Sequence, residues 1–383
     1  MDLATFRRLL TPEGQALLAE ATAGAASESD LALGTRLRRE HDADLVAAAV
    51  SQVRLRAKAR TKLGDDAASM YFTPDALEQA TRATVARLRA ERLARSAERV
   101  VDLGCGIGGD LVAFARAGVT VRGVERDPVR AAIARANLEA LGLDGEVIEG
   151  DLADVTLAAD EVPFLDPARR SGAGRVFDPA AMEPPWDVVL QHLRGRAVVK
   201  TLPGLDHGLV PDDVEAQWVS DGGDLVEACL WGPGLAEVPR RATVLPGERE
   251  LAGSGEPGVV GEVGGFLHEP DDSVIRAGLV GELAARMGSR LVDPHIAYVT
   301  TDDAVTDPLA RSFRIDAELP FREKQLRAAL RERGVGTLTV KKRGVDVVPE
   351  RLVQRLRLRG EVTATVVMTR VAGEGRAFLV DPL

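Results

Sequence analysis

Apolar and polar positions divide the chain into regions of different periodicity. Up to about residue 95, a sequence rich in Ala, Leu and Arg with apolar positions at helical spacing predicts helices. Thr11-Pro12-Glu13 and Thr73-Pro74-Asp75 each place an N-cap residue before a proline at the first helical position. Apolar spacing from Leu77 onward predicts an amphipathic helix that ends near Arg95. The first region is therefore expected to be all-helical.

From residue 96 to about residue 235, short apolar runs alternate with helical stretches. This alternation predicts βαβ units and a parallel sheet that is covered on both faces. Asp221-Gly222-Gly223-Asp224 separates the last two runs, and such a turn joins antiparallel strands. Pro163 is expected at the start of its strand, because proline does not fit the middle of a central strand. The predicted strands span 100–103, 119–124, 146–149, 162–165, 197–200, 215–220 and 225–231, with a helix at 128–141.

The rest of the chain is expected to form a connector and a small α+β domain. Residues 236–265 are rich in Gly and Pro, and the pattern after them predicts one helix over residues 273–287. From about Val292, strand and helix patterns alternate, and Gly373-Glu374-Gly375 is expected to form the last turn. The expected elements of this domain are strands at 312–316, 337–341, 363–370 and 376–380, and helices at 321–333 and 349–356.

Composition narrows the class of protein. A chain of 383 residues, with 45% hydrophobic and 28% charged residues, has the length and balance of two or three globular domains. Two cysteines, Cys105 and Cys229, cannot build a disulfide framework, and the His and Cys residues lack metal-binding spacing. The sequence begins without an apolar signal core, and no stretch reaches transmembrane length. We therefore expect a cytoplasmic enzyme or binding protein with neither a membrane segment nor a metal.

The distribution of charge adds one qualification. A net charge of −10 argues against a uniformly basic nucleic-acid-binding protein. Between Arg322 and Arg359, however, twelve basic and four acidic side chains leave a local excess of eight positive charges. A second basic run comprises Arg54, Arg56, Lys58, Arg60 and Lys62. A solvated helix face would also explain either run by itself.

Residues 100–110, Val-Val-Asp-Leu-Gly-Cys-Gly-Ile-Gly-Gly-Asp, combine an apolar strand, an acid at its end and a glycine-rich turn before a helix. Glycines leave no Cβ between the backbone and a nucleotide-like ligand. Gly104, Gly106 and Gly109 match the dinucleotide fingerprint G-x-G-x-x-G, and Glu125 lies where a ribose-binding acid is expected. An NAD-dependent dehydrogenase is therefore one hypothesis.

Asp102 and the predicted closing hairpin favour another cofactor. An anion at the end of the strand would repel a pyrophosphate, whereas it suits a ligand with a positive amine and no phosphate. The acid, the loop Gly104-x-Gly106-x-Gly108 and the antiparallel last strand together resemble the class I S-adenosylmethionine-dependent methyltransferases, over residues 72–231. The resemblance implies an α/β fold with a seven-stranded Rossmann-like sheet, and S-adenosyl-L-methionine as the cofactor.

The same resemblance implies a role for each residue around the glycine turn. The loop would approach the methionine part of the cofactor, and Asp102 would assist its amino group. Glu125 would bind the ribose hydroxyls, because a carboxylate accepts two hydroxyl hydrogen bonds at once. Asp151 would lie by the adenine. The implied cofactor-binding residues are Phe72, Thr73, Asp102, Gly104, Cys105, Gly106, Gly108, Asp110, Glu125, Arg126, Asp151 and Leu152.

The fourth predicted strand leads into Asp166-Pro167-Ala168-Arg169-Arg170, at the edge where an open α/β sheet binds ligands. Methyltransferases that act on exocyclic amines of bases carry Asp/Asn-Pro-Pro-aromatic there, with oxygens that accept from the amine and a ring that stacks on the base. Asp166 and Pro167 fit this motif, whereas Ala168 and Arg169 do not. A guanidinium plane also stacks on a base, so Arg169 is the candidate replacement for the ring. A simple Asp-Pro turn is the alternative; the predicted catalytic residues are Asp166, Pro167 and Arg169.

Further segments extend the resemblance to nearly the whole chain. Phe72-Thr73-Pro74 resembles the segment that trimethylguanosine synthase-like enzymes fold over the cofactor. Arg56-x-Lys58-Ala59-x-x-Lys62, the Asp166 box and the basic tail are similar to bacterial methyltransferases with a C-terminal THUMP-like domain. THUMP-type domains are associated with RNA, which implies an RNA substrate, and Lys341, Lys342 and Arg343 are predicted to contact phosphate. The expected domains are helical (1–71), methyltransferase (72–235), connector and docking segment (236–291) and THUMP-like α+β (292–383).

The leading hypothesis is an S-adenosylmethionine-dependent methyltransferase that acts on an exocyclic base amine of RNA. Methyl transfer depends on alignment and electrostatic support and needs no covalent enzyme intermediate. Cys105 lies in the glycine loop and Cys229 in a predicted strand, which disfavours cysteine-dependent carbon-5 methylation. Two alternatives stay open: a methyltransferase of small molecules or proteins, and a non-catalytic RNA-binding protein that retains the cofactor fold.

Overall fold

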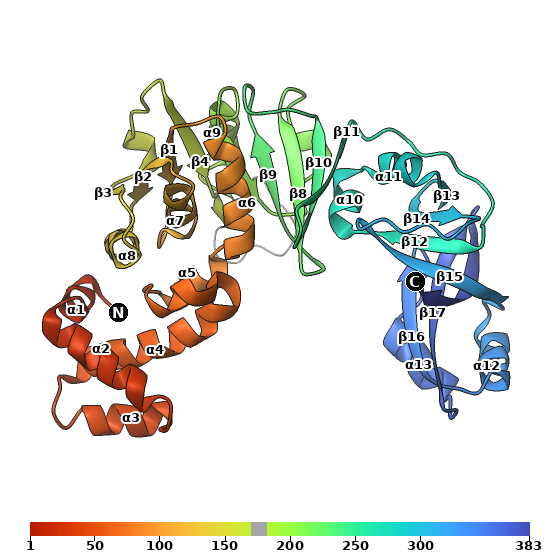
Figure 1. Cartoon of the computed structure of the whole chain (residues 1–383), viewed down its shortest axis with the longest axis horizontal. Coiled ribbons are helices and arrows are strands. Elements are labelled where there is room, and N and C mark those ends of the chain that lie inside the picture. The colour runs from red at the N-terminus through yellow and green to blue at the C-terminus, as the bar shows by residue number, and fades with distance from the viewer. Residues whose placement is uncertain (170–181) are drawn as a thin grey trace. The chain divides into compact units, whose positions relative to one another are not determined.

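The computed structural model describes residues 1–169 and 182–383 (Figure 1). The described chain forms two compact units. The first comprises Met1–Thr201 and Leu230–Leu235, and the second comprises Leu202–Cys229 and Ala236–Leu383. None of the helices in this part of the chain is long and apolar enough to cross a membrane.

The first unit begins with helices, as the sequence predicts. Side chains of Asp2, Thr11, Ser29, Asp42 and Thr73 cap the helices that follow them by accepting from backbone N–H groups. The helix expected from Leu77 to Arg95 is interrupted, because the backbone is extended at Ala80 and Arg82. The helical elements are α1 (Leu3–Leu9), α2 (Pro12–Gly24), α3 (Asp30–Leu37), α4 (Ala43–Leu63), the 3-10 helix η1 (Gly64–Ala68), α5 (Pro74–Gln79) and α6 (Ala83–Ala94).

A nine-stranded mixed sheet confirms the α/β class, in the order β11-β10-β8-β9-β7-β4-β1-β2-β3. β1 pairs in parallel with β2 and β4, as do β2 with β3 and β4 with β7. The β8–β9 hairpin turns through Gly222 and Gly223, which both have positive φ. The seven predicted strands are all present: β1 (Arg99–Leu103), β2 (Thr120–Glu125), β3 (Glu146–Glu149), β4 (Glu161–Leu165), β7 (Val198–Thr201), β8 (Glu215–Asp221) and β9 (Asp224–Trp231).

Pro163 corrects one expectation about this sheet. It is the third of the five residues of β4, not the first. Pairing of β4 with β7 begins at Phe164, one residue later, so the β7 ladder requires no N–H from the proline. The helices α7 (Gly109–Arg116) and α8 (Pro128–Ala140) follow β1 and β2 and pack on the sheet, and α9 (Trp186–His192) precedes β7.

Residues 236–291 hold more regular structure than a connector. Strands β10 (Arg240–Leu245) and β11 (Arg249–Gly253) extend the nine-stranded sheet, and β12 (Phe266–Pro270) and β13 (Arg290–Asp293) join a second sheet. The single helix predicted over 273–287 is wrong. The chain instead forms α10 (Asp272–Ala277) and α11 (Val280–Met287), because Gly278 adopts positive φ and ends the first helix.

The second unit contains a seven-stranded sheet in the order β13-β14-β12-β15-β18-β17-β16. β16 and β17 pair in parallel, and β15, β17 and β18 pair antiparallel. Helices α12 and α13 pack on β16, where Leu326, Leu330, Leu352 and Leu356 form a core with the sheet. Every predicted element from residue 312 on is present: β15 (Ala310–Leu319), α12 (Glu323–Glu332), β16 (Val335–Arg343), α13 (Pro349–Leu356), β17 (Val362–Val371) and β18 (Glu374–Pro382), with β14 (Ile296–Thr301) before them.

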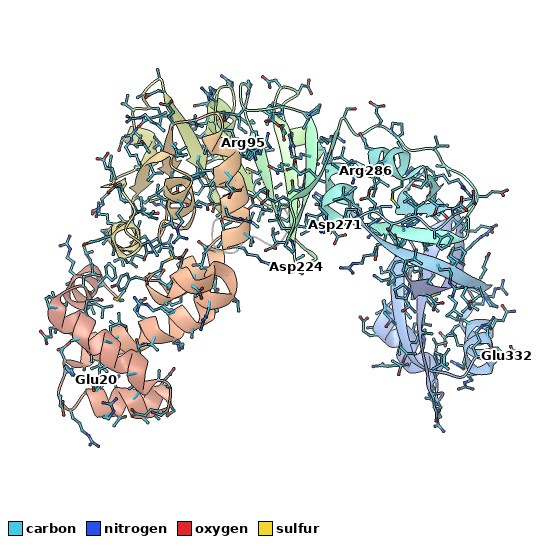
Figure 2. The ribbon with its side chains drawn as sticks, viewed as in Figure 1. Glu20, Arg95, Asp224, Asp271, Arg286 and Glu332 are labelled. Atoms are coloured by element: carbon cyan, nitrogen blue, oxygen red, sulfur yellow. The ribbon has the colours of Figure 1, made fainter. Side chains whose placement is uncertain are left out.

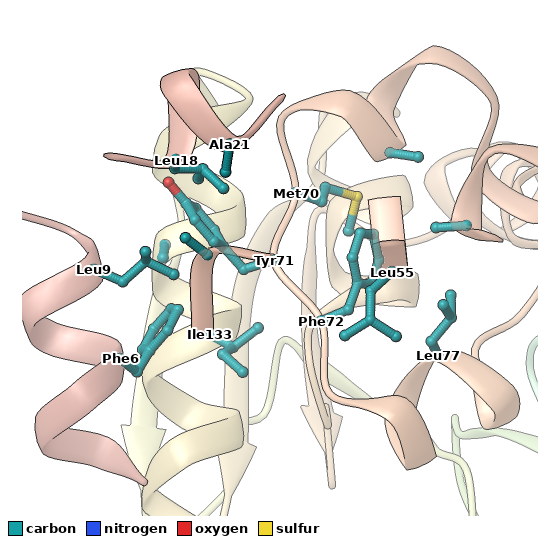
Figure 3. Packing of buried hydrophobic residues seen from close by; sticks show 14 of the residues in the cluster. Phe6, Leu9, Leu18, Ala21, Leu55, Met70, Tyr71, Phe72, Leu77 and Ile133 are labelled. Atoms are coloured by element: carbon teal, nitrogen blue, oxygen red, sulfur yellow. The ribbon is translucent and has the colours of Figure 1, made fainter. Parts of the chain in front are cut away.

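One hydrophobic core joins the N-terminal helices to the α/β part of the first unit (Figure 3). Phe6 of α1 packs edge-to-face on Tyr71, with ring centroids 5.5 Å apart. Phe72 is fully buried beside Leu55 of α4, and Ile133 of α8 belongs to the same core. The segment around residues 70–72 is therefore enclosed between α4 on one side and α8 on the other, and it enters the site described next.

Candidate cofactor and methyl-acceptor site

The glycine loop after β1 has a backbone that side chains would disfavour. Gly104 and Gly106 have φ of +97° and +58°, a region that residues with a Cβ rarely adopt. The Gly104 and Cys105 N–H groups both donate to the carbonyl of Val124, which ties the loop to β2. A Cβ built on Gly104 or Gly106 meets no protein atom within 4 Å, so the described residues leave this side of the loop open to a ligand.

Glu125 fixes the same loop from the end of β2. Its Oε2 accepts from the Gly106 N–H at 2.9 Å, and its Oε1 accepts from the Asp127 N–H at 2.8 Å. The Glu125 carbonyl accepts from Gly150, so the turn before Asp151 lies against the end of β2. Because each carboxylate oxygen has a second lone pair, Glu125 retains acceptor capacity for ligand hydroxyl groups.

Arg126 and Asp151 border this acid. Arg126 donates to Glu183 at 2.6 Å, an ion pair that raises the pKa of the guanidinium, and the negative charges of Asp151 and Glu125 add to the increase. Asp151 is exposed and caps the 3-10 helix η2 (Leu152–Asp154) through the Ala153 N–H. The structure therefore brings together the acids predicted at the ends of β1, β2 and β3.

The segment that contains Phe72 and Thr73 is held by side chains from two helices. Gln52 of α4 both donates to the Phe72 carbonyl at 2.8 Å and accepts from its N–H at 2.9 Å. Asn137 of α8 does the same for Tyr71, at 3.1 and 2.7 Å. Asn137 also donates to the carbonyl of Ile107 at 2.8 Å. It therefore connects residues 70–73 directly to the glycine loop.

Asp102 and Asp110 lie in a buried group of charges beneath the loop. Arg89 of α6, itself 2% exposed, forms an ion pair with Asp110, and the Thr81 hydroxyl donates to Asp110 at 2.9 Å. Burial raises the pKa of the Asp102 carboxyl well above its ordinary value, and the negative charges of Asp110 and Asp166 add to the increase. Burial likewise raises the pKa of the Cys105 thiol, which keeps it protonated.

Asp166 follows β4 at the carboxyl edge of the sheet. Because Leu165 is in register with Leu103 of β1 and Val199 of β7, Asp166 lies one step beyond, between Gly104 and Lys200. Lys200 forms an ion pair with Asp166, and the Asp166 side chain is 36% exposed. Pro167 is buried, and the backbone of Ala168–Arg169 forms β5, antiparallel to β6 (Met182–Glu183). The Arg169 side chain and Arg170 lie outside the described part of the chain.

The structure assigns different surroundings to the three cations predicted to contact phosphate. Lys341 Nζ contacts Glu269 Oε2 at 2.6 Å and lies over the Phe313 ring. Arg343 Nη2 lies 3.8 Å from Asp272 Oδ1. Lys342 is exposed at the end of β16. Lys341 and Arg343 therefore have internal partners, and Lys342 projects to solvent.

Sequence reasoning missed four residues that organise this region: Gln52, Arg89, Asn137 and Lys200. None lies in a recognisable motif. Burial of a polar residue within an apolar helix pattern is the signal that could have identified Gln52, Arg89 and Asn137. Lys200 is a cation at the carboxyl end of a predicted central strand, where such a charge needs a partner.

Comparison with known proteins places these observations in a family. Profiles match a methyltransferase domain at residues 100–164, a THUMP domain-like family at 310–382 and a domain of unknown function at 2–59. A crystal structure from Porphyromonas gingivalis W83, of a protein assigned as a methyltransferase, has a TM-score of 0.78 at 22% identity. The superposition covers 96% of this chain and 98% of the Porphyromonas gingivalis chain. This likeness shows the shared fold.

The family itself is shown by relatives from two strains of Mycobacterium tuberculosis, CDC 1551 / Oshkosh and H37Rv. Each is an uncharacterized S-adenosylmethionine-dependent methyltransferase that is 40% identical over 331 residues, 83% of this chain and 90% of the relative. This similarity decides against the dehydrogenase interpretation of the glycine loop. The chain belongs to the class I S-adenosylmethionine-dependent methyltransferases that carry a C-terminal THUMP-like domain.

Proposed function

We propose that this methyltransferase methylates an exocyclic amine of a base in RNA. The observation that carries the proposal is the position of Asp166, a partly exposed carboxylate beside the glycine loop at the carboxyl edge of β4. Asp166 and Pro167 match the first half of the motif that amine-directed methyltransferases carry at this position. The THUMP-like domain and its local excess of positive charge support RNA as the substrate.

The residues around the glycine loop fit S-adenosylmethionine. The open backbone at Gly104 and Gly106 permits close approach, and buried Asp102 is the acid that would hold the amino group of the cofactor. Glu125 and Asp151 would bind the ribose hydroxyls and lie by the adenine, and Phe72 and Thr73 would enclose the cofactor. When bound, the cofactor supplies a sulfonium methyl group, which an acceptor nitrogen takes by in-line displacement.

Asp166 would act on the acceptor and not on the cofactor. Its carboxylate accepts hydrogen bonds from the amine, which orients the nitrogen lone pair and stabilises the positive charge that develops on nitrogen. The Pro167 carbonyl is the second acceptor in this scheme, and the Arg169 guanidinium would stack on the base. After transfer, the methylated nitrogen loses one proton, for which Asp166 is the nearest predicted base.

The helical face of the THUMP-like domain offers the phosphate contacts. Lys342 is in register with Met368, and Met368 lines a cavity of about 200 Å³ together with Arg351 and Arg355 of α13. All three cations are exposed, whereas Arg355 also contacts Glu323 at 2.8 Å. We therefore retain Lys342 from the predicted set and add Arg351 and Arg355. Figure 2 draws the side chains of the THUMP-like domain, and its label Glu332 marks the last residue of α12.

Transfer of a labelled methyl group tests the proposal. Purified protein is incubated with S-adenosyl-[methyl-³H]methionine and with RNA, protein or small-molecule fractions from a strain that lacks the gene. We expect label in the RNA fraction with the wild-type protein and none with Asp166→Ala, while both proteins bind S-adenosylmethionine. Label in protein or in small molecules would refute RNA as the substrate. Cofactor binding with no transfer to any fraction would favour a non-catalytic RNA-binding protein.

A further inference from the structure

Lys200 is a nearly buried cation that the sequence did not mark and that faces the methyl-acceptor position. It lies in β7, and its side chain is 15% exposed. Parallel register with β4 places it directly beside Asp166, with which it forms an ion pair. Burying a charged ammonium at the end of a central strand costs free energy. We therefore ask which function a lysine at this position could serve.

The surroundings of Lys200 contain an excess of acids. Asp102 of β1 and Asp166 interact electrostatically with each other and with Lys200. Asp110 of α7 also faces Asp102, and its own ion pair is with Arg89 of α6. Arg89 forms its ion pair with Asp110, and among the described residues Lys200 is the cation that pairs with Asp166. The Cys105 thiol faces Asp102 and Glu125.

A second lysine nearby does not replace Lys200. Lys62, at the end of α4, interacts electrostatically with Lys200. Its Nζ, however, donates to the carbonyls of Leu77, Glu78 and Ala80 at 3.1, 2.6 and 3.3 Å. Lys62 therefore caps the C-terminal end of α5. Its positive charge disfavours a second ammonium group close by. The carboxylate of Asp166 compensates the charge of Lys200 through their ion pair.

We infer that Lys200 is a positioning residue for methyl transfer, which fixes the orientation of the Asp166 carboxylate and supplies the positive charge that faces Asp102 and Asp166. The inference rests on the proposed role of Asp166. Lys200 occupies Oδ2 of that carboxylate, so one oxygen stays directed by the ion pair while the partly exposed group can still accept from an amine. Without the ammonium, the Asp166 carboxylate would lose the contact that directs Oδ2, and the pKa of Asp102, which the charge of Lys200 lowers, would rise further.

Kinetics of three variants test this role. Lys200→Met keeps the unbranched side chain and removes the charge, Lys200→Arg restores a cation, and Lys58→Met removes an exposed lysine from its ion pair with Glu78. With RNA from the gene-deleted strain, we expect Lys200→Met to lower kcat roughly a hundredfold, with the KM for S-adenosylmethionine unchanged. Because the ammonium lowers the pKa of Asp102, the acid limb of kcat against pH should move to higher pH in this variant. Lys200→Arg should restore the wild-type limb, and Lys58→Met should match wild type.

A titration without substrate separates this inference from the proposed function. Aspartate carboxyl groups labelled with ¹³C are followed by NMR as the pH changes, and Asp102→Asn identifies the Asp102 signal. We expect Asp102 to take up its proton at higher pH in Lys200→Met than in the wild type, because the charge of Lys200 lowers its pKa. Identical titrations in the two proteins would overturn the inference, even if RNA is methylated. If the wild-type protein methylates no RNA, the proposed function fails and the titration still decides the role of Lys200.

Discussion

Replacing Asn137 by Leu would release the glycine loop from residues 70–73 and change little volume. The wild-type side chain is fully buried and makes three hydrogen bonds, of 2.7, 3.1 and 2.8 Å, with Tyr71 and Ile107. A hydrogen bond contributes about 1 kcal/mol net, so the variant should lose about 3 kcal/mol of unfolding free energy. The bond to Ile107 alone bears on the loop that binds the cofactor. Its loss should raise the Kd for S-adenosylmethionine by about fivefold to tenfold.

Calorimetric titration with S-adenosylmethionine and denaturant unfolding measure the two effects. The matched control is Thr300→Val in the second unit, because Thr300 is fully buried and makes two hydrogen bonds, with Gly264 and Phe266. This control should lose about 2 kcal/mol of stability and keep the wild-type Kd. The reasoning is refuted if Asn137→Leu is destabilised but binds the cofactor normally, or if both variants weaken binding equally.

Three further outcomes follow from the same geometry. Asp166→Ala should lower kcat at least a hundredfold with unchanged Kd for S-adenosylmethionine, and weaker cofactor binding would contradict its placement on the acceptor. Burial raises the pKa of Asp102, so the contribution of this group to the free energy of unfolding falls as the pH rises above about 4. Asp102→Asn removes this pH dependence, so its free energy of unfolding at pH 7, relative to that at pH 4, should be higher than in the wild type. The same variant should bind the cofactor more weakly. Replacing Lys342, Arg351 and Arg355 by Glu should reduce the slope of log affinity for RNA against log salt concentration by about 2. Arg7→Glu, at an exposed position of α1, should leave the slope unchanged. An unchanged slope in the triple variant would show that these three residues do not contact RNA.

Local patterns in the sequence were sufficient to predict the strands and the turn around the glycine loop. The glycine turn, the acids at the strand ends and the two-glycine hairpin are each determined by a few neighbouring residues, and the structure shows the strands that they imply. Strand β10 was missed because its pattern begins with two arginines. Arg241 is partly buried there by an ion pair with Glu215, a fully buried residue on β8, at 2.8 Å. When the partner of a buried charge lies on another strand, the sequence around that charge alone does not indicate that it is buried.

The contact between Asp166 and Lys200 depends on register between segments that are far apart in the sequence. Lys200 is the neighbour of Asp166 because β7 pairs with β4, and neither strand encodes that pairing by itself. The break at Gly278 shows the converse limit. An apolar pattern at helical spacing continues through residues 273–287, and the positive φ of one glycine divides it. Helical spacing can therefore predict that such residues are buried without predicting that one helix contains them.

Mass spectrometry of RNA nucleosides tests the central claim most directly. RNA is compared from the parent strain, a strain without the gene, and that strain complemented with the wild-type gene or with Asp166→Ala. The account predicts that one nucleoside methylated on an exocyclic nitrogen disappears on deletion, returns with the wild-type gene and stays absent with Asp166→Ala. An unchanged set of methylated nucleosides in the deletion strain, or restoration by Asp166→Ala, would contradict it.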